Sequence, residues 1–515
     1  MGIPVYFKTL ISQYQDDILV KHSLDIDVLC LDLNCLIHPC CRSVMSSDDP
    51  TNEDKMIETI LASIESILQY TNLSDTLYIA IDGVAPKAKM KQQRQRRHKS
   101  IYEKKTWDTN AISPGTYFME TLHTSLREWM NSQDTYHVIL SDSNEPGEGE
   151  HKILHYLRHT DTSEKKVSIY GLDADLIMLG LVSGVSELYL LRERTEYNIE
   201  NCDNEYIYLH IESLKTYILQ DIGINSKIHE SVIIHDYIFL CFLVGNDFIN
   251  HSVTLSLRYN GLDHILKTYK MLQSRYQGYF QLIDLEIDHM IHLTFFKEFL
   301  RELSRQESYI LETRRKIREK QSKKMYSHYH AEFEDWKAYH TLQIQDVPQT
   351  HPTPSHHISL AHIHSYLDDH QEDQSKDMMN VLPMFYVKEE QQVLKNSYYE
   401  DGDSKDICQD YLDSLVWTTH YYFKGCVNWS WCTRYHRAPF VKDLSRYLDT
   451  LPKLEITTNT HPMTIPAQLS FIFPSKSHAL HGYDITPSCP THAVTDVLFS
   501  RYLWESELIL TSHGS

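Results

Sequence analysis

Several features that would assign the chain to a class at once are missing. Its longest apolar stretches, such as residues 28–31 and 176–182, are far shorter than the roughly 20 residues that span a bilayer. Asp16 and Asp17 interrupt the region in which a secretory signal needs an apolar core. We therefore expect an intracellular chain with no membrane partner.

The chain also lacks a metal-binding cysteine pattern and an excess of basic charge. Its ten cysteines include no Cys-x-x-Cys pair and follow neither a zinc nor a disulfide spacing, which predicts reduced thiols. The formal net charge of −21 argues against non-specific binding of nucleic acid over the whole surface, because such binding needs clustered Lys and Arg. Any nucleic-acid site must therefore be local.

Apolar runs and amphipathic segments alternate in the first part of the chain. The apolar runs cover residues 28–33, 76–81, 137–140, 167–170 and 187–191, and the amphipathic segments include 55–69 and 120–130. This alternation predicts an α/β fold with a mostly parallel central sheet flanked by helices. Ligands of such sheets bind at the carboxyl ends of the strands, so the acids that follow three of the runs are candidate site residues: Asp32, Asp82 and Asp173.

Composition divides the whole chain into four segments. Residues 1–294 form the predicted core, and residues 295–342 are polar and charged without Pro or Gly, which predicts a long helical segment. The basic cluster in that segment is either a solvated face or a surface for RNA or a partner. Residues 343–379 are rich in Pro and His, as is typical of a linker, and residues 380–515 form a second compact region.

Seven carboxylates stand in recognisable local contexts. They are Asp32 in LDLNCLIH, Asp82 in AIDGVAPKAK, Glu148 and Glu150 in EPGEGEHK, Asp173 and Asp175 in GLDADLIML, and Asp247 in GNDF. So many acids can share one pocket only if cations neutralise them, and Mg²⁺ or Mn²⁺ prefers such oxygen ligands. Two of these ions about 4 Å apart can bridge a phosphodiester and activate water. The acids therefore predict a metal-dependent phosphodiesterase.

Single members of this set have a simpler explanation. An Asp after a strand is often a helix cap, and Asp173 alone could be structural. The Glu148/Glu150 and Asp173/Asp175 pairs are spaced at i and i+2, which on an extended segment points both side chains the same way. Two such pairs, two strand-end acids and a GND motif together favour a shared site over coincidence.

A basic segment follows Asp82 closely. Residues 87–105 contain nine Lys or Arg and one Glu, and Lys89, Gln93, Arg96 and Arg97 fall on one face of a predicted helix. The Lys ammonium offers a compact positive charge and the Arg guanidinium offers a fork of N–H donors, and both suit a terminal phosphate. A solvated face or a nuclear-localisation run is the simpler reading of such a segment, and its closeness to the acids favours the phosphate pocket.

The motifs taken in order resemble the Xrn-type 5′-3′ exoribonucleases along nearly the whole chain. The matching runs are MGIPVYFKTLISQY, LDLNCLIHPC, DGVAPKAKMKQQRQRR, NAISPGTYFM, EPGEGEHKI, GLDADLIMLGL and GNDF, with YYFKGCVNWSWCTRYHRAPF and LWESELIL in the second region. The resemblance implies a nuclease core of the PIN or flap-endonuclease kind. It also implies processive 5′-3′ hydrolysis of single-stranded RNA carrying a 5′-monophosphate, with release of nucleoside 5′-monophosphates.

The resemblance also assigns roles to residues. The metal ligands and catalytic acids for two Mg²⁺ or Mn²⁺ ions would be Asp32, Asp82, Glu148, Glu150, Asp173, Asp175 and Asp247. The 5′ phosphate would be held by Lys89, Gln93, Arg96 and Arg97. The first base would stack on His38 and on either Trp429 or Trp431, with the second region completing the channel. Stacking of this kind contributes about 1–3 kcal/mol per base.

Some residues depart from the family pattern in the base-binding channel, and others indicate the branch of the family, cytoplasmic or nuclear. Cys432 and Thr433 replace aromatic residues, and Arg437 replaces a Tyr. Arg434 and the Gly425-Cys426 pair are similar to the cytoplasmic branch, so we expect cytoplasmic rather than nuclear localisation. The chain ends where larger cytoplasmic members continue, which suits a short, viral version.

Two alternatives compete with this reading. A flap-type structure-specific endonuclease would use the same acids on duplex DNA but would need a duplex clamp, and no helix-hairpin-helix pattern is found. A catalytically inactive RNA-binding scaffold would lack an acid, whereas all seven family positions are filled. We expect a monomer, and the decapping machinery is one candidate among unknown protein partners in RNA decay.

Overall fold

The fold is taken from a computed structural model. It describes residues 16–46, 49, 51–100, 106–194, 204–223, 229–252, 254–328, 399, 403–435, 437–486, 495–496 and 509–510. The strands are β1 (Leu19–Val20), β2 (Ile26–Asp32), β3 (Leu73–Ala80), β4 (His137–Ser141), β5 (Val167–Tyr170), β6 (Leu188–Glu193), β7 (Tyr206–His210), β8 (Thr495–Asp496) and β9 (Ile509–Leu510).

The main sheet is mixed and mostly parallel. Its seven strands lie in the order β1-β7-β6-β5-β2-β3-β4. Strands β2 to β6 pair in parallel, while β7 is antiparallel to β6 and β1 is antiparallel to β7. The predicted α/β sheet is confirmed, and each of the five predicted runs forms a strand. The prediction missed β1 and β7, which add an antiparallel edge to the sheet.

The central strand β2 is buried on both faces. Val28 and Cys30 pack into one hydrophobic core, while Leu29 and Leu31 pack into a second core on the opposite face. Alternate side chains of a strand point to opposite faces, so a strand covered on both sides reads as a continuous apolar run. Each fully buried Val or Leu side chain of this strand contributes on the order of 1.5–3 kcal/mol.

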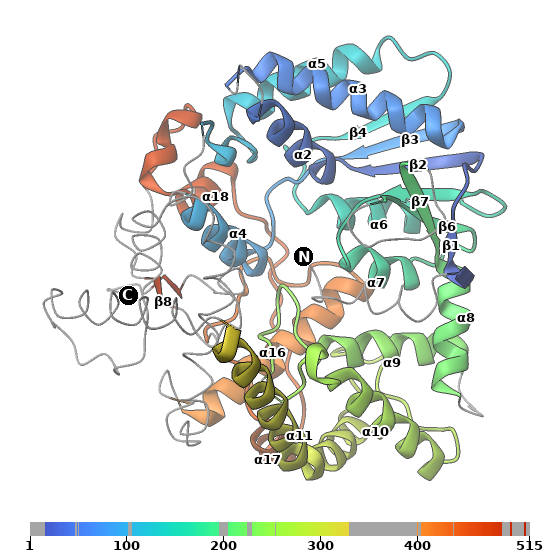
Figure 1. Cartoon of the computed structure of the whole chain (residues 1–515), viewed down its shortest axis with the longest axis vertical. Helices are drawn as coiled ribbons and strands as arrows, with labels where there is room; N and C mark the ends of the chain where they lie inside the picture. Colours follow the sequence, from blue (N-terminus) through green and yellow to red (C-terminus); the bar gives the residue numbers. More distant parts are fainter. Residues whose placement is uncertain are drawn as a thin grey trace, which may run out of the picture.

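Helices cover both faces of the sheet (Figure 1). One face carries α2 (Asn34–Met45), α3 (Glu53–Thr71) and α5 (Tyr117–Met130), whose buried residues belong to the same core as Leu29. The other face carries α6 (Gly149–His159), α7 (Asp175–Leu181) and α8 (Ile211–Ile222). The sheet is therefore covered on both sides, and its carboxyl edge remains the place for a site.

Local signals explain where α3 begins and ends. The side chain of Asn52 accepts a hydrogen bond of 2.9 Å from the backbone N–H of Lys55, which caps the first turn. Asn72 after the helix has φ +43°, a left-handed conformation that Asn tolerates better than most residues. The chain then enters β3 directly.

A mainly helical part follows the sheet, and most of it lies below the sheet in Figure 1. It contains α9 (Glu230–Phe242), α10 (Gly261–Arg275), α11 (Leu293–His328), α16 (Ser404–Phe423), α17 (Val441–Thr450) and α18 (Ile465–Ile472). Helix α4 (Lys87–Ser100) lies beside α18, and short 3-10 helices occupy η1 (Thr109–Ala111), η2 (Leu257–Tyr259) and η3 (Ser475–Leu480).

Helix α11 is the predicted long charged helix, and it spans 36 residues. Its N-terminal half is anchored by fully buried Phe296, Phe299 and Leu303. Glu307 on α11 accepts hydrogen bonds of 2.7 and 3.0 Å from the backbone N–H groups of Val441 and Lys442, which begin α17. The predicted continuation to residue 342, the linker at 343–379 and residues 380–398 lie outside the described residues.

Membrane insertion and disulfides can be assessed for the described residues only. None of the helices in this part of the chain is both long enough and apolar enough to span a membrane. The cysteines within the described ranges are all free thiols.

Candidate active site

Three of the predicted acids follow neighbouring parallel strands. Asp32 is the last residue of β2, Asp82 comes two residues after β3, and Asp173 follows β5. Strand β2 lies between β3 and β5 in the sheet. The structure therefore places these three acids at one edge, where the carboxyl ends of parallel strands meet.

Gly149 lets the N-terminus of α6 approach this edge closely. The backbone N–H of Gly149 donates a hydrogen bond of 2.7 Å to Asp82 Oδ1. A Cβ atom at Gly149 would lie 2.7 Å from Asp32 Oδ1, so any larger residue would displace the carboxylate. The approach also brings the positive end of the helix dipole to two acids, which stabilises their negative charge.

The two i, i+2 acid pairs do not lie on extended segments, and that premise of the sequence analysis was wrong. Glu148 is extended, but α6 begins at Gly149, so Glu150 lies in the first helical turn. Helix α7 begins at Asp175, and Ala174 before it already has a helical conformation. Both pairs straddle helix N-termini, where unpaired N–H groups favour acidic side chains.

Lys89 connects the basic helix to the acids. Its ammonium nitrogen lies 2.6 Å from Glu148 Oε2 and 3.0 Å from Asp247 Oδ2, and all three side chains are buried. Burial alone lowers the pKa of Lys89, but the carboxylates of Glu148 and Asp247 outweigh this and raise that pKa well above its ordinary value. Lys89 therefore carries a positive charge inside the acidic cluster.

Three of the acids, Asp32, Asp175 and Glu150, resist ionisation in this cluster. Burial and the neighbouring Asp82 raise the pKa of Asp32 to about 8, and burial and Asp247 raise the pKa of Asp175 to about 6. Burial and Asp175 raise the pKa of Glu150 well above its usual range. Close carboxylates shift one another in this way unless a cation compensates them.

The donor set fits divalent cations. Asp32 Oδ1, Glu150 Oε2 and Asp175 Oδ1 are buried and have no hydrogen-bond partner among the described residues. Buried polar atoms normally have a partner, so three unpartnered carboxylate oxygens in one cluster suit ligands of a hard metal ion. Asp247 is different, because Lys89 lowers its pKa below the usual range despite burial.

Helix α4 carries the four residues predicted to hold a phosphate. Beyond the buried Lys89, Gln93 is buried with Oε1 unpartnered among the described residues. Arg97 donates hydrogen bonds of 3.1 and 2.9 Å to Ser113 Oγ. The Arg96 side chain is 44% exposed, and one of its terminal nitrogens lies 3.8 Å from Asp247 Oδ2. The helix thus presents both buried and accessible donors beside the acids.

The second region packs directly against α4. The carbonyl of Trp429 accepts a hydrogen bond of 3.0 Å from the backbone N–H of Lys87, the first residue of the helix. Lys91 Nζ donates a bond of 2.9 Å to the carbonyl of Thr433. The Arg94 guanidinium lies 4.9 Å from the ring centroid of Phe471 on α18. The basic helix is therefore held between the main sheet and the second region.

The three predicted base-stacking residues occupy different environments. His38 is an exposed residue of α2, the helix that follows Asp32. Trp431 stacks on Trp417 with ring centroids 5.2 Å apart and packs against the main core. Trp429 is half-buried and lies next to the start of α4.

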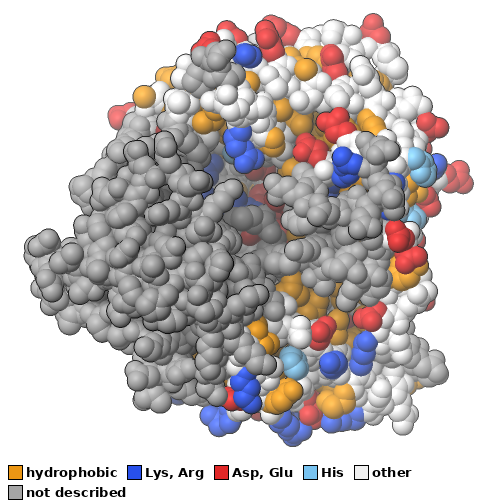
Figure 2. All heavy atoms as spheres, in the orientation of Figure 1, with side chains coloured by type: hydrophobic (Ala, Val, Ile, Leu, Met, Phe, Trp, Pro, Cys, Tyr) orange, Lys and Arg blue, Asp and Glu red, His pale blue; other side chains and the backbone are white. Residues whose placement is uncertain are grey.

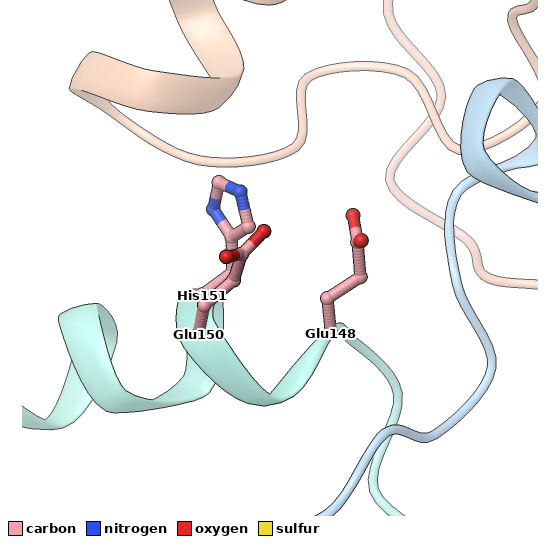
Figure 3. A group of neighbouring side chains, drawn as sticks. All are labelled: Glu148, Glu150 and His151. Atoms are coloured by element: carbon pink, nitrogen blue, oxygen red, sulfur yellow. The ribbon is translucent and has the colours of Figure 1, made fainter. Parts of the chain in front are cut away.

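His151 and Tyr421 are site residues that the sequence analysis missed. Glu148, Glu150 and His151 each offer a ligand atom within 4.8 Å of the others, and Figure 3 shows them rising from the first turn of α6. His151 stands three residues after Glu148, a helical spacing that could have drawn attention to it. The Tyr421 hydroxyl donates a bond of 2.7 Å to Glu148 Oε1, and no sequence pattern links residues 273 positions apart.

The described part of the face drawn in Figure 2 carries charges of both signs. Figure 2 shows acidic and basic side chains interspersed on the viewed face. This distribution agrees with the net charge of −21 and leaves α4 as a local concentration of positive charge.

Comparisons with known proteins match both halves of the chain. Residues 1–194 match the family described as "XRN 5'-3' exonuclease N-terminus", and residues 227–482 match "Xrn1 helical domain". The 5'-3' exoribonuclease 2 homolog of Caenorhabditis elegans is 26% identical, with 93% of this chain and 65% of that protein covered. The 5'-3' exoribonuclease 1 of Homo sapiens is 28% identical, with 96% of this chain and 31% of that protein covered.

Solved structures similar to this chain cover about half of it. The catalytic core of Rad2 in complex with DNA substrate is 17% identical with a TM-score of 0.32, covering 54% of this chain and 74% of that one. The T5 D15 protein co-crystallised with metal ions is 9% identical with a TM-score of 0.29, covering 56% of this chain and 87% of that one. The two family matches, which together take in both the sheet and the helical part, show that the chain belongs to the Xrn family of 5′-3′ exonucleases.

Proposed function

We propose that this chain hydrolyses single-stranded RNA processively from a 5′-monophosphorylated end and releases nucleoside 5′-monophosphates. One observation carries the proposal: a cluster of buried acids at the carboxyl edge of the sheet is joined through Lys89 to a basic helix. The proposed site for metal ions and the proposed site for a terminal phosphate are thus adjacent. Family membership supports the direction of hydrolysis. The chain spans only 65% of the worm relative, so its activity is proposed on its own residues.

Two Mg²⁺ or Mn²⁺ ions are the proposed cofactors. Candidate ligands are Asp32, Asp82, Glu148, Glu150, Asp173, Asp175 and Asp247. The buried unpartnered oxygens of Asp32, Glu150 and Asp175 are the strongest support for them. When bound, such a pair supplies activation of the attacking water and stabilisation of the leaving oxygen. The protein's own part is to hold its carboxylates on rigid strand ends and helix N-termini.

The 5′ phosphate is proposed to bind on α4. Arg96 is accessible and offers a forked donor, while Arg97 is held by Ser113 and Gln93 lies one turn before it. Burial and the neighbouring Arg96 lower the pKa of Arg97 to about 10, so it stays charged near neutral pH. Lys89 is proposed to share its charge between the phosphate and the acids. A capped or triphosphorylated end is too bulky for such a pocket.

The first base is proposed to stack between His38 and Trp429. Trp429 lies at the start of α4, whereas Trp431 is already stacked on Trp417. His38 lies about one turn into α2, the helix that begins two residues after Asp32 at the same sheet edge. Stacking tolerates any base, which suits an enzyme that degrades RNA of any sequence.

The organisation of the chain around this function remains part of the proposal. Residues 1–294 would form the catalytic core, and residues 380–515 would complete the substrate channel. A monomer acting in RNA decay in the cytoplasm, with the decapping machinery as one candidate partner, fits this assignment. A flap-type endonuclease and an inactive RNA-binding scaffold are the competing functions.

Product analysis separates the three functions. RNA with a radioactive 5′-monophosphate is incubated with Mg²⁺ or Mn²⁺, and products are resolved by length. The proposed exonuclease releases the label as a mononucleotide from the first time point. Labelled oligonucleotides would instead indicate an endonuclease, and RNA binding without any release of label would indicate a scaffold.

A further inference from the structure

Tyr421 on α16 reaches from the second region to one of the candidate metal ligands. Its hydroxyl lies 2.7 Å from Glu148 Oε1, and both residues are 3% exposed. The other oxygen of Glu148 lies 2.6 Å from Lys89 Nζ. Each oxygen of this carboxylate therefore has its own donor, one from α4 and one from α16.

Three rings pack directly against Tyr421 and restrict the direction of its hydroxyl. His151 stacks on the Tyr421 ring at a centroid distance of 3.6 Å and an interplanar angle of 24°. Trp417 stacks on Tyr421 at 4.8 Å and 29°, and Trp431 stacks on Trp417 at 5.2 Å and 24°. Phe248 meets the Tyr421 ring edge-on at 5.4 Å and 85°. Neighbouring rings on several sides leave the hydroxyl one direction, toward Glu148.

We propose that Tyr421 is a positioning residue that holds the Glu148 carboxylate in the orientation needed to bind a divalent cation. This inference rests on the proposed metal-dependent function and adds a residue of the second region to the site. Burying a hydroxyl costs free energy unless the hydroxyl is hydrogen-bonded. If packing were the only role of this ring, a Phe at position 421 would serve equally well. The hydroxyl thus has a role that the ring does not need.

The aromatic stack also explains how the second region acts on the acids. It runs from His151 on α6 through Tyr421 and Trp417 to Trp431 in the loop that follows α16. Trp417 is fixed in turn, because its Nε1–H donates a bond of 2.8 Å to the carbonyl of Asn428. Residues of the second region therefore orient the Glu148 carboxylate, in addition to any part they take in the substrate channel.

The test replaces the hydroxyl alone. Tyr421→Phe removes the hydroxyl and keeps the stacked ring. The matched control is Tyr447→Phe, because the Tyr447 hydroxyl also donates a hydrogen bond to α16, over 2.8 Å to Gln409. Gln409 lies roughly 18 Å along the helix from Tyr421 at 1.5 Å per residue. Mn²⁺ binding is measured by calorimetry without RNA, kcat and KM are measured on 5′-monophosphorylated RNA, and melting is followed by circular dichroism.

The expected result is a selective defect in metal binding. Tyr421→Phe should weaken Mn²⁺ binding and lower kcat by about 10- to 100-fold, the range found when a hydrogen-bond partner of a metal ligand is removed. The KM for RNA should stay unchanged, and Tyr447→Phe should behave as the unsubstituted protein.

Three results would overturn the proposal. Mn²⁺ binding and kcat equal to those of Tyr447→Phe would show that the hydroxyl positions nothing. A lower melting temperature with unchanged Mn²⁺ binding would assign the hydroxyl to stability alone. A rise in KM only would make Tyr421 a substrate contact. If the unsubstituted protein cleaves no RNA, the proposed function fails, and the Mn²⁺ titration still decides the role of Tyr421.

Discussion

Lys89 and Glu148 form a buried ion pair, with 2.6 Å between the ammonium nitrogen and a carboxylate oxygen, and this pair joins the basic helix to the acidic cluster. Removing one partner of a buried pair leaves an uncompensated charge, which typically costs about 3–5 kcal/mol. Lys89→Met should therefore lower the free energy of unfolding by that amount in EDTA. Added Mn²⁺ should restore part of the loss, because a cation can compensate the same carboxylates. Urea unfolding in both conditions measures this.

The matched control for Lys89 is a surface lysine. Lys165 lies 2.7 Å from Asp75, and both side chains are well exposed. Lys165→Met should cost about 0–1 kcal/mol with or without Mn²⁺, as surface pairs do. Equal losses for the two variants would contradict the assignment of Lys89 to a buried acidic cluster.

Metal binding should release protons. Burial and neighbouring acids raise the pKa of Asp32 to about 8 and that of Asp175 to about 6, so both carboxyls hold protons in slightly acidic solution. A divalent cation must displace these protons, and Mn²⁺ affinity should rise with pH from below 6 until it levels above about 8. Calorimetry in two buffers of different ionisation enthalpy counts the protons. An affinity independent of pH over this range is the contrary outcome.

Arg96 should select the 5′ end of the substrate. A hydrogen bond from a charged group to a phosphate contributes about 1.5–3 kcal/mol, so Arg96→Ala should lower kcat/KM on 5′-monophosphorylated RNA by about 10- to 100-fold. Activity on RNA with a 5′-hydroxyl should change little. Arg446→Ala on the exposed side of α17 is the control for a lost surface charge. Equal losses on both substrates would place Arg96 along the RNA backbone instead.

His235 should make the protein less stable in acid. Burial lowers the pKa of His235 to about 4, while the unfolded chain keeps the ordinary value of about 6.5. Between these values the unfolded state binds more protons, so stability is complete above pH 6.5 and falls as the pH drops toward 4. His235→Phe should flatten this part of the stability curve, and exposed His461→Asn should not. Identical curves for His235→Phe and the unsubstituted protein would refute this source of acid sensitivity.

The sequence was sufficient for features set by local pattern. The five apolar runs form β2 to β6, of which the central strands β2 and β5 are buried while the edge strand β4 stays partly exposed. The acids after β2, β3 and β5 lie at one edge because these strands are neighbours and parallel. The short β1 has only two residues, and β7 was missed although Tyr206–His210 is rich in β-forming side chains.

Contacts between distant segments could not be predicted in this way. The partnership of Tyr421 with Glu148 depends on how α16 packs against α6, which no spacing encodes. The same holds for Lys89, which was predicted on a phosphate-binding face and also pairs with Asp247. The prediction placed Glu150 on an extended segment because no Ser, Thr, Asp or Asn marks the start of α6. The N-cap residue is Glu148, whose side chain makes no capping hydrogen bond.

The most direct test of the account is digestion of 3′-labelled single-stranded RNA that carries a 5′-monophosphate, a 5′-triphosphate or a 5′-hydroxyl. Each substrate is incubated with Mg²⁺, with Mn²⁺ or with EDTA, beside an Asp173→Ala variant. The account predicts metal-dependent degradation of the monophosphate substrate, poor cleavage of the other two, and no activity in the variant. Equal rates on all three ends, or activity that persists in EDTA, would contradict it.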